Sequence, residues 1–434
     1  MKKQFSALLC MAVSAAALSG CAGYGSEGII IKDKPHSGTA ATDLRLFGYK
    51  VGTPSLLAIE NTFVAFLKEH SGLNVIYEGI IEDEYYPAFE KRSETGNLSD
   101  AFMINTEIYR TLRKDNKLAD LSDAVDLNSF TKTVKDQIVG EDGRAYFIPG
   151  AVSGYSMYVN YDLLRRENIA VPTNLSEFTE ACRYFVSKNV IPVIINNDNA
   201  LMTLIQTKGL YSVYQSADVN EKIASFNDNP YLAYEYICEG IDLVSDMVDG
   251  GFVAMKEGLE TKQSTEEIDL FVKGDRPFMI ASSLISGQVK ERFFAENNSF
   301  NYGIHPYPIL SDGSVLAIDL DTCIAVNAEG ANLASAKKLV SFMSKPSHIY
   351  DYSESQSSFM PLADCKKPSD AALAPSYDHY VSGKIVVQYD YRLTIEELDE
   401  LVYDCGAMLV CGESKEAVKE YLEAGLIERG GRKI

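Results

Sequence analysis

Residues 143–195 read GRAYFIPGAVSGYSMYVNYDLLRRENIAVPTNLSEFTEACRYFVSKNVIPVII, and this stretch decides the fold class of the chain. It contains two predicted apolar strands, from Ala145 to Pro149 and from Gly154 to Val159, with glycines loosening the backbone between them. Asn174 begins a capping box with the glutamate three residues later, and apolar residues then recur at helical spacing. The run 190–195 reads as a buried parallel strand, so the order of elements predicts an α/β domain.

Three further strands are predicted upstream, at residues 44–49, 74–80 and 101–104, with a helix in each interval. No tight hairpin joins them, so we expect parallel βαβ units, whose ligands gather at the carboxyl ends of the strands. The residues at the ends of the first and third strands are therefore predicted to point at one mouth of the sheet. They are Tyr49, Lys50, Asn105 and Glu107.

Four segments carry a resemblance to a known family: GRAYFIP at 143–149, YVNYDL at 158–163, PTNLSEF at 172–178 and YGIHPYP at 302–308. Together and in this order they resemble the type 1 extracellular solute-binding proteins, the carbohydrate-binding lipoproteins of ABC importers. The chain departs from that pattern near residue 284, where a tryptophan is usual. It has no tryptophan at all and 26 tyrosines.

The resemblance implies an α/β, two-lobed, periplasmic-binding-protein-like fold of type II. Each lobe is then a mixed sheet flanked by helices, and the lobes are discontinuous in sequence and joined by a hinge. Residues 318–326 fit a second crossing between the lobes, and residues 359–362 fit a third. The implied boundaries are 43–149 with 322–361 for lobe 1, and 150–321 with 362–434 for lobe 2.

The N-terminus has the pattern of an export signal. Two lysines precede an apolar run that is too short to span a membrane, and residues 18–21 read LSGC. This matches the bacterial lipobox, so we expect a lipoprotein signal peptide over residues 1–20 and a lipid attached to Cys21. Residues 21–42, rich in small and polar side chains, are expected to form a lipid-anchored flexible tether. The predicted location is the outer face of the bacterial plasma membrane.

Composition excludes several classes of function. The 434 residues are 46% hydrophobic, which supports real cores, and the net charge of −21 argues against binding nucleic acid. Six cysteines beyond the signal and Cys21 lack the spacing of a zinc site, and their scatter predicts buried free thiols. Five histidines form no HExxH motif. We therefore expect no metal and no cofactor.

A sugar site needs aromatic rings for the apolar face of the sugar and acceptors for its hydroxyl groups, because an unpaired buried hydroxyl costs about 1–3 kcal/mol. Tyr155 and Tyr158 lie on opposite faces of one strand, so one of them is expected to be core. Asp319 and Asp321 share a face of their strand. The candidate rings are Tyr49, Tyr155, Tyr158 and Tyr211. The candidate polar partners are Lys50, Asn105, Glu107, Ser153, Ser283, Asp319 and Asp321.

The sequence contains no catalytic triad signature, nucleophile elbow or phosphate loop, so we predict a monomeric binding protein without catalytic residues. Its expected partners are a carbohydrate ligand, an oligosaccharide above all, the permease subunits of an ABC transporter, and the membrane through Cys21. Two alternatives stay open. The missing tryptophans are compatible with a non-sugar solute such as a peptide, and the strand carboxylates with a surface-anchored glycoside hydrolase.

Overall fold

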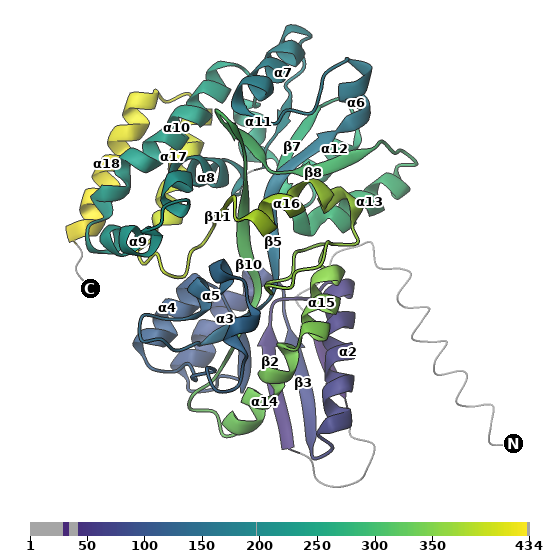
Figure 1. Cartoon of the computed structure of the whole chain (residues 1–434), viewed down its shortest axis with the longest axis vertical. Coiled ribbons are helices and arrows are strands. Elements are labelled where there is room, and N and C mark those ends of the chain that lie inside the picture. Colours follow the sequence, from purple (N-terminus) through teal and green to yellow (C-terminus); the bar gives the residue numbers. More distant parts are fainter. Residues whose placement is uncertain (1–28, 34–41, 197, 432–434) are drawn as a thin grey trace, which may run out of the picture.

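Two long antiparallel strands, β5 (Phe147–Asn160) and β10 (Gly313–Val326), run through the whole molecule and join its two lobes (Figure 1). Their register extends from Tyr155 opposite Ala317 to Phe147 opposite Ala325. This computed structural model describes residues 29–33, 42–196 and 198–431. The predicted signal peptide and Cys21 lie outside the described residues.

Lobe 1 is the lower lobe in Figure 1, in which helices flank a small sheet. Besides the ends of β5 and β10, its elements are β1 (Ile29–Asp33), β2 (Thr42–Gly48), α2 (Thr53–Glu69), β3 (Leu73–Gly79), α3 (Glu82–Glu94), β4 (Ala101–Ile104), α4 (Thr106–Lys114), η1 (Leu127–Ser129), α5 (Lys132–Ile138), α14 (Leu333–Met343) and α15 (Pro346–Ser355).

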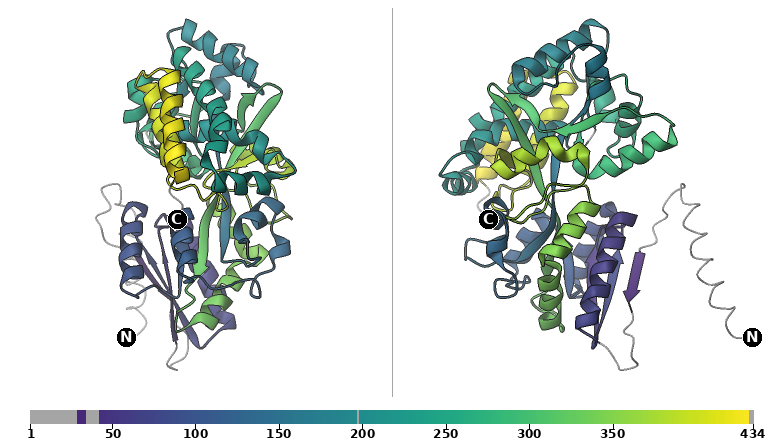
Figure 2. Two further views of the ribbon diagram at one scale, coloured as in Figure 1. Left: turned by 90° about the vertical axis from the view of Figure 1, so that its left-hand side faces the viewer. Right: turned by 45° about the vertical axis from the view of Figure 1, so that its right-hand side comes forward.

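Lobe 2 is the upper, larger and more helical lobe, and the two side views in Figure 2 show the same division. Its elements are α6 (Tyr161–Arg166), α7 (Leu175–Ser187), β6 (Val193–Ile194), α8 (Ala200–Tyr214), α9 (Val219–Asp228), η2 (Pro230–Ala233), α10 (Tyr234–Asp249), α11 (Met255–Glu260), α12 (Glu266–Val272), β7 (Phe278–Ser282), η3 (Ser283–Ile285), α13 (Ser286–Ala295), β8 (Tyr302–His305), β9 (Tyr307–Leu310), η4 (Ala371–Leu373), α16 (Ala374–Ser382), β11 (Ile385–Val387), α17 (Leu398–Val410) and α18 (Lys415–Gly431). The exact residue boundaries of both lobes stay predictions.

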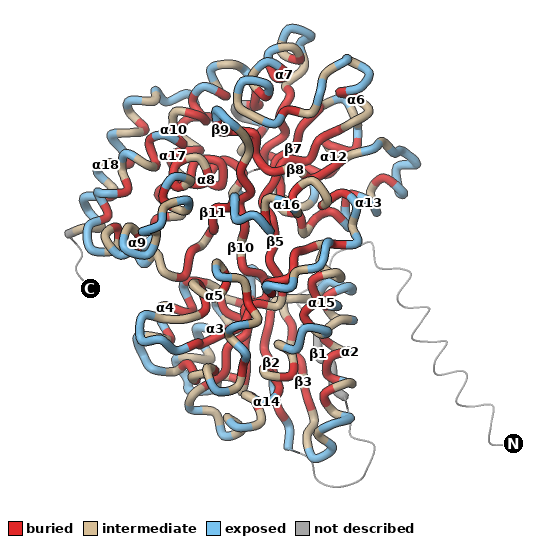
Figure 3. Tube along the Cα trace, viewed as in Figure 1, coloured by how far each residue is buried: buried red, intermediate tan, exposed pale blue. Residues whose placement is uncertain are grey.

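Within the described residues the strands form one 11-stranded mixed sheet, whose main path runs β1-β3-β2-β4-β10-β5-β7-β6. The expected parallel pairing of the first three predicted strands is confirmed, because β2 pairs in parallel with both β3 and β4. One apolar cluster fills lobe 1 and continues along one face of the sheet in lobe 2, and a second lies on the opposite face. Figure 3 shows that buried residues follow the strands through both lobes. The α/β, two-lobed fold is thus as predicted.

The prediction of two separate strands at 145–149 and 154–159 is wrong, because β5 is continuous. From Phe147 to Tyr155, across the predicted break, it is held by β10, a partner more than 150 residues away that no local pattern reveals. The rest of the strand pairs with β7 and β8. Gly150 does not break the strand. It makes room for a ring, since a Cβ at this position would lie 3.0 Å from the Tyr352 side chain.

The crossing point between the lobes has an unusual backbone. Thr322 adopts a φ of 53°, which is rare for a β-branched residue, and the paired register skips it between Asp321 and Cys323. The Thr322 hydroxyl lies 2.8 Å from the Tyr352 hydroxyl. The predicted third crossing lies beside this point, where Phe359 and Val152 exchange two backbone hydrogen bonds of 2.8 and 2.9 Å.

Local signals were mixed in their outcome. The Asn174 cap is confirmed, since its side chain accepts from the backbone N–H of Glu177 at 3.1 Å. The sequence also predicts a capping box formed by Thr394 and Glu397, and this prediction is wrong. The helix begins at Leu398 after Glu397 in the left-handed region, and the Thr394 N–H donates to Asn227 instead.

The predicted flexible tether over residues 21–42 is partly wrong, because Ile29–Asp33 forms the edge strand β1, antiparallel to β3. The six cysteines in the described part of the chain are free thiols. No helix among the described residues is long and apolar enough to cross a membrane. The same residues contain no cluster of three or more side chains suited to a metal ion.

Candidate ligand site at the lobe junction

The carboxyl ends of β2 and β4 bring aromatic and polar side chains of lobe 1 together. Tyr49 follows β2 and lies edge-on to Tyr85, with ring centroids 5.3 Å apart, and its ring centroid is 6.3 Å from that of Tyr86. Asn105 follows β4 and caps α4 by accepting from a backbone N–H. The Tyr86 hydroxyl donates to Glu82 at 3.0 Å. Parallel strands therefore deliver Tyr49 and Asn105 to one edge, as their spacing predicts.

Lys50 joins this edge to the crossing strand β10. Its ammonium lies 2.6 Å from a carboxylate oxygen of Asp321, and the two side chains are only 14% and 8% exposed. Burial opposes the charge on Lys50, yet the nearby Asp321 carboxylate raises the pKa of Lys50 above its usual value. The pair is thus a buried ion pair at the point where the chain passes between the lobes.

Asp319 lies on β10, two residues before Asp321, and is half-buried at the junction. Burial, and next the negative charge of Asp321, raise the pKa of Asp319 well above its usual range. A carboxyl group in this setting favours a hydrogen-bonded partner over an ionic one. It can accept from a ligand hydroxyl group when ionised and also donate when protonated.

Lobe 2 contributes a hydrogen-bonded chain of side chains. The Tyr155 hydroxyl donates to the side-chain oxygen Oδ1 of Asn199 and accepts from the side-chain amide of Asn196 at 3.1 Å. Asn196 also donates to the fully buried Glu267 at 2.6 Å. Asp198 is exposed as a whole residue, yet partial burial of its carboxyl group, and then the negative charges of Glu82 and Asp83 in lobe 1, raise the pKa of Asp198. The two lobes therefore place carboxylates near one another across the junction.

Tyr389 and Asp399 are junction residues that sequence reasoning missed. Tyr389 is half-buried, and its hydroxyl lies near the Asn199 side chain. Burial mainly, and then the carboxylates of Asp399, Asp319 and Asp198, raise the pKa of Tyr389. Asp399 accepts from Gln206 at 2.7 Å. One signal was available, because Tyr389 follows the apolar run of β11 just as Tyr49 follows β2.

The structure does not bring all predicted site residues to this junction. Tyr158 is fully buried and donates to the Ser282 carbonyl at 2.8 Å, so Tyr155 is the ring of this pair that belongs to the junction. Ser153 is buried in β5 but lies directly opposite Asp319 of β10, so it stays with the junction residues. The other three predicted residues lie elsewhere: Glu107, exposed in the first turn of α4; Tyr211, in the last turn of α8 near Asp312; and Ser283, which accepts from the Gly154 N–H at 3.0 Å.

We use the name junction cluster for the predicted and newly found residues that meet where the two lobes join. The name covers Tyr49, Lys50, Glu82, Tyr86, Asn105, Ser153, Tyr155, Asn196, Asp198, Asn199, Asp319, Asp321, Tyr389 and Asp399.

Glu267 is expected to make stability depend on pH. Burial raises the pKa of Glu267 to about 7, so its neutral form is the one favoured by folding. The stabilising contribution of neutral Glu267 is therefore complete below pH 4.5 and is lost as pH rises through 7. At about 1.4 kcal/mol for each pKa unit, the loss is about 3 kcal/mol.

Urea unfolding at pH 5 and pH 8 measures this loss, and Glu267→Gln should abolish most of the difference. An equal pH dependence in wild type and variant would assign the effect to other groups.

Comparisons with known proteins agree with this geometry. Residues 61–375 match the family model described as "Bacterial extracellular solute-binding protein". No curated protein sequence matches the chain.

Several solved structures share the fold. The binding protein MsmE from Bacillus subtilis, in an open conformation, has a TM-score of 0.71 and 18% identity, covering 90% of this chain and 98% of that one. Apo RafE from Streptococcus pneumoniae has a TM-score of 0.70 and 16% identity, covering 91% of this chain and 99% of that one. A sugar transporter protein from Bacillus licheniformis in complex with stachyose has a TM-score of 0.65 and 18% identity, covering 88% of this chain and 98% of that one. This chain belongs to the bacterial extracellular solute-binding protein family.

Proposed function

We propose that this protein captures an oligosaccharide between its two lobes at the junction cluster. The observation that carries the proposal is the arrangement around Asp319, where tyrosine rings and hydroxyl acceptors from both lobes lie close together. Tyrosine can stack on a sugar ring and hydrogen-bond at once, which suits a chain without tryptophan. Fold neighbours crystallised with stachyose and with raffinose support the choice of ligand class.

The anchoring and delivery steps belong to the same proposal. A lipid on Cys21 would hold the protein at the outer face of the plasma membrane, and the permease of an ABC transporter would receive the ligand. Ligand contacts with both lobes would stabilise a closed form, and the shift equals the difference in affinity between the open and closed states. Globomycin-sensitive processing of the precursor, or labelling with a fatty-acid probe lost in Cys21→Ser, tests the anchor.

We assign no catalytic role to the carboxylates. A glycoside hydrolase needs two carboxyl groups placed on either side of the scissile bond. Asp319 and Asp321 lie two residues apart on one strand, and Asp321 is committed to Lys50 at 2.6 Å. This arrangement favours binding over hydrolysis. Incubation with stachyose, raffinose and chitin oligosaccharides followed by product analysis should return the sugars intact.

A thermal-shift screen tests the ligand class directly. A ligand at a hundredfold excess over its Kd stabilises the folded protein by about 2.7 kcal/mol. We expect at least one oligosaccharide in a panel of galactosides, glucosides, xylosides and chitin fragments to raise the Tm. A set of peptides is screened beside the sugars. If no sugar raises the Tm and a peptide does, the sugar assignment is overturned and the peptide alternative is favoured.

Asp319→Ala is expected to weaken oligosaccharide binding by about 10- to 100-fold. The loss follows because a ligand hydroxyl left without a buried acceptor costs about 1–3 kcal/mol. Titration calorimetry with a sugar from the screen measures it. Asp312→Ala, at an exposed turn between β9 and β10, is the matched control and should bind like wild type. Equal affinities for the two variants would remove Asp319 from the site.

A further inference from the structure

A short segment of lobe 2, Gln388–Thr394, reaches across to lobe 1. We call it the strap. It lies between β11 and α17, both elements of lobe 2. Its successive side chains contact different parts of the molecule. Tyr389 belongs to the junction cluster, Asp390 contacts lobe 2, and Tyr391 packs into lobe 1.

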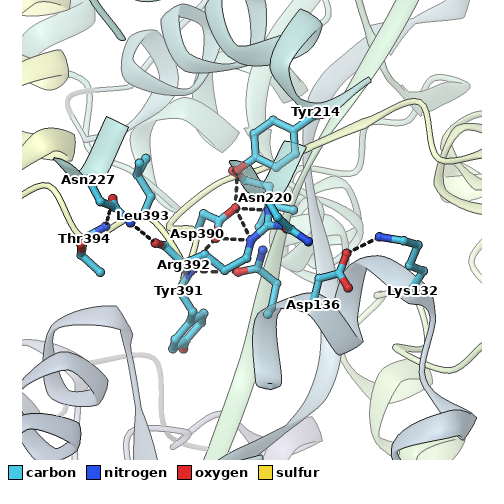
Figure 4. Close-up of polar contacts among 12 residues, drawn as sticks. Lys132, Asp136, Tyr214, Asn220, Asn227, Asp390, Tyr391, Arg392, Leu393 and Thr394 are labelled. Atoms are coloured by element: carbon cyan, nitrogen blue, oxygen red, sulfur yellow. Dashed lines mark hydrogen bonds and ion pairs between the residues drawn. The ribbon is translucent and has the colours of Figure 1, made fainter. Parts of the chain in front are cut away.

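The strap is fixed to lobe 2 by a polar network around the buried Asp390 (Figure 4). The Asp390 side chain is 1% exposed and pairs with Arg392 at 2.5 Å. The Tyr214 hydroxyl donates to Asp390 at 2.6 Å, and Arg392 donates to Asn220 at 2.7 Å. Asn227 donates to the carbonyl oxygen of Arg392 at 2.8 Å. The strap is therefore clamped on α8 and α9.

Tyr391 docks the same segment into lobe 1. Its ring centroid lies 4.4 Å from that of Phe147 and 5.3 Å from that of Tyr109, and the residue is only 5% exposed. Its backbone N–H donates to the buried side chain of Gln137 at 2.8 Å. Its hydroxyl contacts the thiol of Cys323 on β10. Four side chains from lobe 1 thus enclose one residue of a lobe 2 segment.

A second contact between the lobes lies next to this dock, since the Arg110 guanidinium on α4 donates to the carbonyl oxygen of Leu393. Tyr389 stands between the clamp and β11 with a φ of 49°, a conformation that a non-glycine residue keeps only when its surroundings enforce it. Since the strap is fixed on both lobes, the position of the Tyr389 ring depends on the dock.

We propose that Tyr391 is a positioning residue: by docking the strap into lobe 1 it holds the lobes together and places Tyr389 at the junction cluster before any ligand binds. The inference deepens the proposed function and rests on it for the part played by Tyr389. Moving the strap away from lobe 1 would break the contacts of Tyr391 with the Phe147 and Tyr109 rings, so the dock favours the joined arrangement. Preorganised side chains bind a ligand more tightly because less ordering remains to be done.

The test compares Tyr391→Ala and Tyr391→Phe in the full chain without ligand. Small-angle X-ray scattering reports the lobe arrangement, and hydrogen exchange of peptides covering 388–394 reports the dock. We expect Tyr391→Ala to increase the radius of gyration and to speed strap exchange at least tenfold. Tyr391→Phe keeps the ring and should match wild type. Tyr158→Ala truncates a buried tyrosine outside the dock, so it should leave strap exchange slow.

A milder pair of variants serves if circular dichroism shows that Tyr391→Ala does not fold. Gln137→Met removes the acceptor of the Tyr391 N–H, whereas Gln137→Glu keeps it. We expect faster strap exchange in Gln137→Met alone. Unchanged strap exchange and scattering in Gln137→Met, or in a folded Tyr391→Ala, would overturn the proposal.

Binding measurements with a sugar distinguish failure of this inference from failure of the proposed function. With the sugar found by thermal shift, Tyr391→Ala should bind at least tenfold more weakly, and Tyr391→Phe should restore the affinity. If no sugar binds the wild-type protein, the proposed function fails, while the ligand-free measurements still decide the role of the strap. Weakened binding without any change in the empty protein would contradict a positioning role.

Discussion

Replacing Lys50 by methionine is expected to lower the free energy of unfolding by about 3–5 kcal/mol. The substitution keeps the length of the side chain but leaves the Asp321 carboxylate, 8% exposed, without its cation at 2.6 Å. Removing one member of a buried pair is costly because the remaining charge stays desolvated. Urea unfolding at neutral pH measures the loss.

The double variant Lys50→Met/Asp321→Asn should recover most of this stability, because it removes both charges together. The exposed pair of Lys345 and Glu69 supplies the control. Its atoms are 3.3 Å apart and its side chains are 47% and 56% exposed, so Lys345→Met should cost at most about 1 kcal/mol. A Lys50→Met protein within 1 kcal/mol of wild type would show that water reaches Asp321 freely.

Gly240→Ala is expected to destabilise lobe 2 by about 3 kcal/mol or more, although alanine is the better helix former. Gly240 lies in α10 where this helix crosses α8. A Cβ added there would lie 2.6 Å from both the Cα and the carbonyl carbon of Ile205, and closer still to its carbonyl oxygen. These are backbone atoms, so the helices themselves must move apart.

Gly287→Ala is the matched control, since it also places a methyl group on a helix but meets nothing within 4 Å. It should leave the Tm unchanged or raise it, because alanine reduces the entropy of the unfolded chain. Differential scanning calorimetry compares the two variants. A Gly240→Ala protein as stable as Gly287→Ala would mean that α8 and α10 can separate without loss of packing.

Those parts of the fold that depend on neighbouring residues could be predicted from the sequence. The Asn174 cap needs only the next three residues, and the parallel order of β2, β3 and β4 follows from the helices between them. The continuity of β5 could not be predicted in this way. It is imposed by β10, whose sequence lies far along the chain.

The candidate site divides along the same line. Tyr49, Lys50 and Asn105 follow from the rule that parallel strands end at one edge. Period-two alternation separated Tyr155 from Tyr158 but did not say which ring faces the core. Asp198, Tyr389 and Asp399 could not be predicted, because their positions depend on how the lobes meet. Contacts between segments that are distant in sequence determine that arrangement.

The distribution of thiols gives a practical handle on the native protein. Among the six described cysteines, Cys411 at the end of α17 is exposed, Cys365 is half-buried, and the other four are buried. Of these six, Cys411 should therefore react with a maleimide dye in the native protein, whereas denaturant should expose the buried thiols to the reagent. Attachment to a sensor chip through Cys411 would present the molecule from the end of α17.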